Sequence, residues 1–227
     1  MTQGLPVRLT AENAEALARR VELSDGARLL VRPDQSPREL LDQLIDGRHH
    51  LDAVRLMAHA LPKREALWWA ARCARMAAGD PPPEAQAAAL DAADDWLLDP
   101  TDARRRAAMP AAEAAGLGTP AGCTCAGIFF SGGSVAPSGL PEVPPADHAT
   151  AQFVAAAVSL AAVRIEPEKA PDKHRLHLAL GRKIIDGDEL PPSPPGEASL
   201  STAAGPIAAA EAAEPTAPTA QRPSLFF

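Results

Sequence analysis

The sequence contains no tyrosine, and aromatic residues make up only 4% of its 227 residues. Alanine supplies much of the 46% hydrophobic content. Alanine has the highest intrinsic helix propensity, but it buries little apolar area. We therefore expect an all-α protein whose helices approach one another closely, with a few large side chains anchoring the core.

Cysteines and basic clusters are also few. The three cysteines, Cys73, Cys123 and Cys125, cannot all pair within one chain, which favours a reducing compartment such as the cytoplasm. The net charge of −7 disfavours nucleic acid as a partner, because neutralising phosphates requires a basic face. One run of three arginines occurs, at residues 104–106, and its side chains would point in different directions on a helix.

No apolar run is long enough to span a membrane. The most apolar stretch, residues 153–163, is about half as long as the roughly 20 residues that a bilayer crossing needs. Residues 1–20 lack the apolar centre of a secretory signal. Residues 131–134, Ser-Gly-Gly-Ser, lack the lysine of a phosphate-binding loop, and no nucleophile stands beside a base. We therefore expect a soluble, cytoplasmic protein with no cofactor, and a non-enzymatic role is favoured.

Start and stop signals predict many short helices. Ser36 and Glu39 match a capping box, in which each side chain accepts from the backbone amide of the other. Pro37 occupies the first helical position, where no amide partner is needed. Gly47 is expected to end this helix.

Two segments near the N-terminus have weaker patterns. Thr10 is predicted to cap a helix over residues 11–20. Residues 21–31 allow two interpretations: a hairpin around the Asp-Gly pair, or a short helix capped by Ser24. The lack of other strand patterns favours the helix.

Residues 50–78 contain two amphipathic helix patterns divided by Pro62. Leu51 belongs to the apolar stripe of the first, and Trp69 and Met76 extend the stripe of the second. The segment therefore predicts two packed helices joined by a sharp turn. Further helices are predicted over residues 84–98, 102–115 with a kink or a break at Pro110, 119–130, 147–163 and 171–187.

The later helices carry most of the remaining apolar residues. The helix over 147–163 is almost wholly apolar, so we expect it to be central. In the last helix Leu176 and Ile184 mark the apolar face. Leu140 and Val143, in the preceding loop, are predicted to fold back onto the core.

Composition divides the chain into three parts. Residues 1–33 are predicted to be a helical extension, and residues 34–187 an all-helical domain, either a compact bundle or stacked helix hairpins. Residues 188–227 are rich in proline and alanine and are predicted to form a disordered tail. Removal of this tail is expected to leave the fold intact but to weaken the capture of a partner.

Two places are predicted to bind a protein partner. One is the start of the helix after Pro62, where Arg64 lies near Trp68 and Trp69, residue types that dominate binding hot spots. An ordinary helix start with at least one tryptophan in the core explains the same residues. The other place is the apolar tip of the tail, which can dock in a groove of a partner. The tip consists of Leu225, Phe226 and Phe227.

The strongest candidate metal site consists of Cys123, Cys125, His174 and His177. The two histidines are three residues apart and share a helix face, and thiolate and imidazole groups bind zinc. However, one residue alone separates the cysteines, whereas structural zinc sites usually space them more widely. Two buried thiols beside two surface histidines are therefore the favoured explanation of the pattern.

Three further histidines, His49, His50 and His59, invite an acid–base interpretation. No acid or nucleophile accompanies them at a defined distance, and a general base must be positioned against a substrate. Ordinary solvated positions are therefore favoured for all three.

Residues 34–187 resemble an uncharacterised bacterial family whose genes often lie near type VI secretion components. The resemblance is carried by the segments PDQSPRELLDQLIDGRHHLDAVRLMAHALPKREALWWAARCAR, LDPTDARRRAAMPAAEAAGLGTPAG and FFSGGSVAPSGLPEVPP. It implies a small, all-helical cytoplasmic protein, and it brings no catalytic residues.

The sequence thus predicts a non-catalytic interaction or accessory protein. The resemblance associates it with a bacterial secretion apparatus of the type VI kind, or with the cargo of such an apparatus. The partner is predicted to be a protein, but neither its identity nor the oligomeric state follows from the sequence. The alternative is a metal-dependent enzyme or a zinc-binding protein that uses Cys123, Cys125, His174 and His177.

Overall fold

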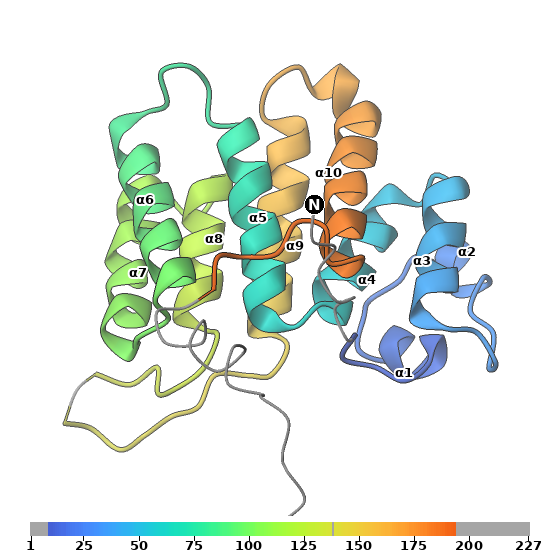
Figure 1. Cartoon of the computed structure of the whole chain (residues 1–227), viewed down its shortest axis with the longest axis horizontal. Helices are drawn as coiled ribbons and strands as arrows, with labels where there is room; N and C mark the ends of the chain where they lie inside the picture. Colours follow the sequence, from blue (N-terminus) through green and yellow to red (C-terminus); the bar gives the residue numbers. More distant parts are fainter. Residues whose placement is uncertain (1–8, 138, 194–227) are drawn as a thin grey trace, which may run out of the picture. The chain divides into compact units, whose positions relative to one another are not determined.

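The computed structural model of the chain describes residues 9–137 and 139–193. These residues form ten α-helices and one short 3-10 helix and contain no strand (Figure 1), so the predicted all-α class is confirmed. The helices are α1 (Ala14–Ala18), α2 (Asp25–Arg28), α3 (Pro37–Asp46), α4 (His50–Ala60), α5 (Lys63–Met76), α6 (Glu84–Leu98), α7 (Asp102–Ala115), α8 (Pro120–Phe129), α9 (Ala149–Val163), η1 (Pro167–Lys169) and α10 (Ala170–Ile185).

Most predicted helix starts are confirmed. At α3 the amide of Glu39 donates to Ser36 Oγ at 3.2 Å, and the amide of Ser36 donates to Glu39 Oε2 at 2.8 Å, which completes the capping box. Thr101 and Thr119 cap α7 and α8 through their side chains alone, which accept from the amides of Arg104 and Gly122. Ser24 caps α2, so residues 21–31 contain the helix rather than the hairpin.

The predicted cap of the first helix is wrong. Asn13 caps α1, which is only five residues long, and its side chain accepts from the amide of Ala16. Thr10 is used differently: its Oγ1 donates to the carbonyl of His59 at 2.7 Å, and its amide donates to the carbonyl of Ala60 at 2.9 Å. Both bonds attach the N-terminal segment to the end of α4, which leaves Thr10 unavailable as a cap.

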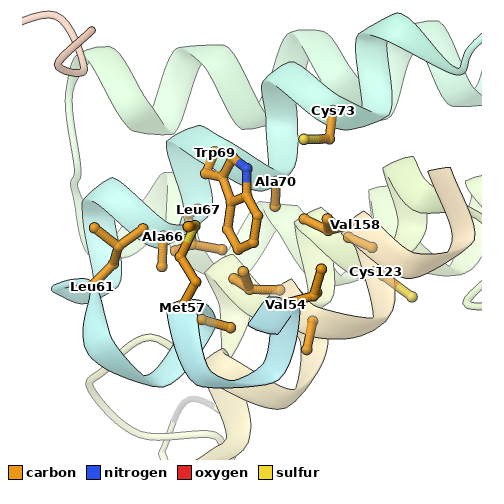
Figure 2. Packing of buried hydrophobic residues seen from close by; sticks show 14 of the residues in the cluster. Val54, Met57, Leu61, Ala66, Leu67, Trp69, Ala70, Cys73, Cys123 and Val158 are labelled. Atoms are coloured by element: carbon orange, nitrogen blue, oxygen red, sulfur yellow. The ribbon is translucent and has the colours of Figure 1, made fainter. Parts of the chain in front are cut away.

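Helix α9 is central, as its composition predicts. It contacts α4, α5, α8, α10 and η1. Val154, Ala157 and Val158 on α9 are fully buried. Figure 2 shows the indole of Trp69 pointing inward from α5, toward the side chains of Met57 and Val54 on α4. A few large side chains among many alanines therefore fill the core, in agreement with the composition.

The apolar stripes are displaced from their predicted faces at three positions. Leu51 of α4, Met76 of α5 and Leu176 of α10 are exposed. On α10 the buried face instead contains Gly181, where an added Cβ would lie 3.2 Å from Trp69 Cε2 and closer still to Met57. Because only glycine permits this approach, the Gly181 face of α10 turns inward and Leu176 turns to solvent.

Two other predictions about apolar packing and helix breaks are also corrected. Leu140 and Val143 are exposed and do not fold back onto the core, because the loop is held by other bonds: the amide of Val135 donates to the carbonyl of Val143 at 2.8 Å. Of the two effects predicted at Pro110, the break is absent, because α7 continues through this residue. Pro110 itself is exposed.

Helix α8 packs closely on the end of α7, and this packing gives a test of the fold. A Cβ at Gly122 would lie 2.1 Å from the carbonyl oxygen of Gly116 and 3.0 Å from that of Ala112. The clash should cost more than the roughly 1 kcal/mol that alanine gains over glycine inside a helix. We therefore expect Gly122→Ala to lower the free energy of unfolding by a net of about 1–3 kcal/mol. Urea unfolding followed by circular dichroism measures this loss.

The matched control is Gly118→Ala, because a Cβ at Gly118 meets nothing within 4 Å. Its free energy of unfolding should stay within about 0.5 kcal/mol of the unchanged protein. Equal stability of the two variants would show that α7 and α8 do not approach as closely as described.

Candidate functional site

The predicted patch at the start of α5 is divided by the structure. Trp69 is fully buried, and its Nε1 donates to the backbone carbonyl of His177 at 2.8 Å. Trp68 is partly exposed, and the guanidinium of Arg72 lies 5.6 Å from the centre of its ring. Trp68 is therefore the tryptophan of this pair that keeps accessible ring surface, whereas Trp69 belongs to the core.

Arg64, the third residue of the patch, holds the chain that follows α10. Its Nη2 donates to the carbonyl of Leu97 at 2.5 Å and to the carbonyl of Pro192. Residues 188–193 consequently cross α5 (Figure 1), and Pro191 is buried there. Their packing places them with the helices rather than with the predicted tail. The tip residues Leu225, Phe226 and Phe227 lie outside the described residues.

The three arginines at 104–106 all make structural bonds. Arg105 is buried, and it donates to the carbonyls of Phe129 at 2.5 Å and Ser134 at 2.9 Å and to Asp102 Oδ1 at 2.8 Å. Arg106 donates to the same carboxylate at 2.9 Å, and these two hydrogen bonds lower the pKa of Asp102. Residues 131–134 thus form a turn whose last carbonyl, that of Ser134, is held by Arg105.

The structure does not bring the predicted metal ligands together. Cys123 and Cys125 lie on α8, where their thiols donate to the carbonyls of Leu117 and Ala89, each at 3.0 Å. Burial raises the pKa of both thiols, that of Cys125 to about 12, which disfavours the thiolate that zinc requires. Residues 9–137 and 139–193 contain no group of three or more His, Cys, Asp or Glu side chains placed to hold a metal ion.

The histidines of α10 are buried, which corrects the expectation that they lie on the surface. His174 packs beside His50 of α4, with ring centroids 6.2 Å apart, and His177 follows one turn later. Burial lowers the pKa of all three, that of His177 to about 4. The positive charges of Arg175 and Arg48 lower the pKa of His50 further.

The acid beside this histidine cluster, Asp52, is engaged in structural bonds. His49, His50 and His174 line a depression of about 460 Å³ together with Asp52, whose Oδ2 lies 3.9 Å from His49 Nδ1. Both oxygens of Asp52 accept hydrogen bonds from Ser24, at 2.8 Å each. The carboxylate therefore anchors the segment before α2, and the cluster is better explained by packing than by catalysis.

One large hollow of the described surface is a groove that the sequence did not reveal. It consists of two adjoining depressions of about 770 and 560 Å³ that share Arg20, His59 and His148. The walls of the first depression come from the segment after α1, the end of α4 and the starts of α5 and α9, which lie at the same end of these helices in Figure 1. The second depression continues along α4 as far as Leu51 and along α9 as far as Ser159. We call this hollow the basic groove.

The basic groove carries an excess of positive charge in an acidic protein. Its charged lining residues are Arg19, Arg20, Arg55 and Lys63 against Asp147 and Glu22. Its floor is apolar, with Ala58, Leu61, Ala66 and Ala151 in one part and Ala155 and Ala156 in the other. Burial, followed by the nearby His148 and Arg20, lowers the pKa of His59.

His59 was predicted at a solvated position, and the structure places it half-buried in this groove. The Arg19-Arg20 pair is the one signal in the sequence that points to the site. Nothing local indicates that residues 20, 59 and 148 meet, because each belongs to a different element.

The fold and this site define the class of the protein. It is an all-α protein of packed short helices with an open basic groove at one end. The chain belongs to the family of unknown function DUF6931, whose family model matches residues 40–185. The predicted resemblance to an uncharacterised family is thereby confirmed. The match extends from α3 to α10, so Arg19, Arg20 and Glu22 of the groove lie outside it.

Other comparisons add no relative. A search of curated proteins found no match, and a search of solved structures found none either. No single helix among the described residues is long and apolar enough to cross a membrane. Helix α9 and residues 167–185 taken together have the length and composition of a membrane span, but the two segments are bent by 116° relative to each other.

Proposed function

We propose that this protein is a non-catalytic accessory protein that acts by binding another protein. The observation that carries the proposal is the basic groove, which is open, large and lined by both charged and apolar side chains. Grooves of this kind suit an extended segment of a partner, with an apolar floor for contact area and charges at the walls for orientation.

We further propose that the partner belongs to a bacterial secretion apparatus of the type VI kind or to its cargo. The support is the resemblance of residues 34–187 to a family whose genes often lie near such components. The experiment is affinity purification of the full chain from its native host, followed by reconstitution of the complex from two purified proteins. A one-to-one complex with a secretion component is the expected result. Failure of every co-purified protein to bind the purified chain would overturn the proposal.

The residues after 193 give a second test of partner binding. Residues 188–193 pack against α5 through Arg64, so the deletion must begin after Ser193 and not after Gly187. We expect removal of residues 194–227 to change the free energy of unfolding by less than about 0.5 kcal/mol while weakening capture of the partner, because the apolar tip is removed. Thermal unfolding and quantitative pull-down measure the two effects.

The control for this deletion is the full chain with Leu225, Phe226 and Phe227 each changed to serine. Weakened capture in both proteins assigns the loss to the tip. Capture that is unchanged in both would exclude a role for the tip in partner binding.

A further inference from the structure

Charge in the basic groove is unevenly neutralised. Arg19 makes an ion pair with Glu15 at 2.6 Å. Arg20 and Lys63, by contrast, make no ion pair with any described residue: Arg20 donates to the carbonyl of Thr10 at 3.4 Å, and Lys63 donates to the carbonyl of Ser131 at 2.9 Å. Both cations therefore keep the capacity to bind an anionic group of another molecule.

The remaining lining residues decide which anion fits. The floor is formed by alanine and leucine side chains, and neither phenylalanine nor tryptophan lines either part of the groove. A nucleic acid strand is disfavoured, because such grooves usually stack bases on aromatic rings and Asp147 and Glu22 would repel its phosphates. A peptide with carboxylates and small apolar side chains matches the walls and the floor together.

We propose that the basic groove binds an acidic segment of a partner protein in an extended conformation, with its carboxylates against Arg20 and Lys63 and its apolar side chains on the alanine floor. This proposal rests on the proposed function and names the chemistry of the partner. Charge complementarity supports it, since the protein as a whole is acidic and the groove is locally basic.

His59 makes the interaction sensitive to pH. The charged groups around it are Arg19, Arg20 and Glu22 after α1, Arg55 on α4, Lys63 on α5 and Asp147 before α9, and His148 lies beside it. A bound carboxylate offsets the neighbouring positive charges and so favours the protonated imidazole of His59. Because burial lowers the pKa of His59 from its usual 6.5, affinity for the acidic segment should rise as the pH falls below that value.

The test uses the full chain and a fluorescein-labelled peptide in which glutamate and leucine alternate. Fluorescence polarisation at low salt measures its affinity, and circular dichroism confirms that each variant is folded. The double variant Arg20→Gln with Lys63→Gln is expected to bind about fivefold more weakly. The matched control is Arg164→Gln with Lys169→Gln, at the other end of α9, which removes the same charge outside the groove and leaves the affinity unchanged.

Three results would overturn the proposal. The first is no binding of the peptide at millimolar concentration, and the second is equal loss in the groove variant and its control. The third is tighter binding of single-stranded oligothymidylate or inorganic phosphate than of the peptide. None of these results changes the outcome of the co-purification experiment, which tests whether the protein binds a partner at all. An error about the groove can therefore be told apart from an error about the proposed function.

Discussion

Replacing Trp69 by alanine is expected to lower the free energy of unfolding by about 3–5 kcal/mol. The indole is fully buried between α5 and α4 (Figure 2), and its removal leaves a large cavity and also frees the carbonyl of His177 that it bonds. Chemical denaturation followed by circular dichroism measures the loss. Trp69→Phe should retain part of the stability, because it refills most of the cavity but restores no donor.

Trp68 provides the matched control. Its ring is partly exposed and lies beside Arg72, although part of it packs against the core, so Trp68→Ala should cost clearly less than Trp69→Ala, about 1–2 kcal/mol. If Trp68 contributes to an interaction surface, its replacement weakens partner capture without unfolding the protein. A larger loss of stability from Trp68→Ala than from Trp69→Ala would contradict the assignment of Trp69 to the core.

Stability is also expected to fall as the pH is lowered from about 6.5 to about 4. In the folded protein burial holds the pKa of His177 at about 4, whereas the unfolded chain has an ordinary histidine pKa of about 6.5. Between these values the unfolded chain binds a proton that the folded protein does not, so protonation favours unfolding. The difference corresponds to about 3 kcal/mol lost over this range, with no further loss from His177 below it.

Urea unfolding across this pH range measures the effect, and His177→Gln isolates it. That variant should be less stable at neutral pH but should show a smaller dependence on pH, because the titrating group is absent. His50 and His174, whose pKa values burial also lowers, add to the same trend in the unchanged protein. An unaltered pH dependence in His177→Gln would show that His177 is not buried as described.

Local signals in the sequence predicted the helices well. The Ser36–Glu39 capping box, the break at Pro62 and the Thr119 cap each depend on residues within one turn, so their effect does not require knowledge of the rest of the fold. The composition of residues 147–163 likewise predicted a central helix, because a helix that is apolar all round must be covered on several sides.

Faces and sites were predicted less well, because they depend on contacts between distant segments. The apolar spacing of α10 favoured burial of Leu176, but the absence of a side chain at Gly181 decided which face approaches Met57 and Trp69. His174 and His177 are buried for the same reason. A glycine that faces a neighbouring helix is the signal that would have corrected this prediction.

The basic groove could not be predicted, since no motif in the sequence relates the segments that form it. Arg20 follows α1, His59 is near the end of α4 and His148 precedes α9. Only the packing of α1, α4, α5 and α9 places these side chains around one hollow. The proposed partner chemistry therefore follows from tertiary structure, whereas the proposed association with secretion follows from the resemblance.

The buried guanidinium of Arg105 determines how the connection from α8 to α9 leaves the helices. One planar group bonds the carbonyls of Phe129 and Ser134 and lies 5.4 Å from the ring centre of Phe129, a combination that the single ammonium of lysine cannot reproduce. The start of this loop is therefore fixed to α7 by a side chain that no other residue type replaces in both roles.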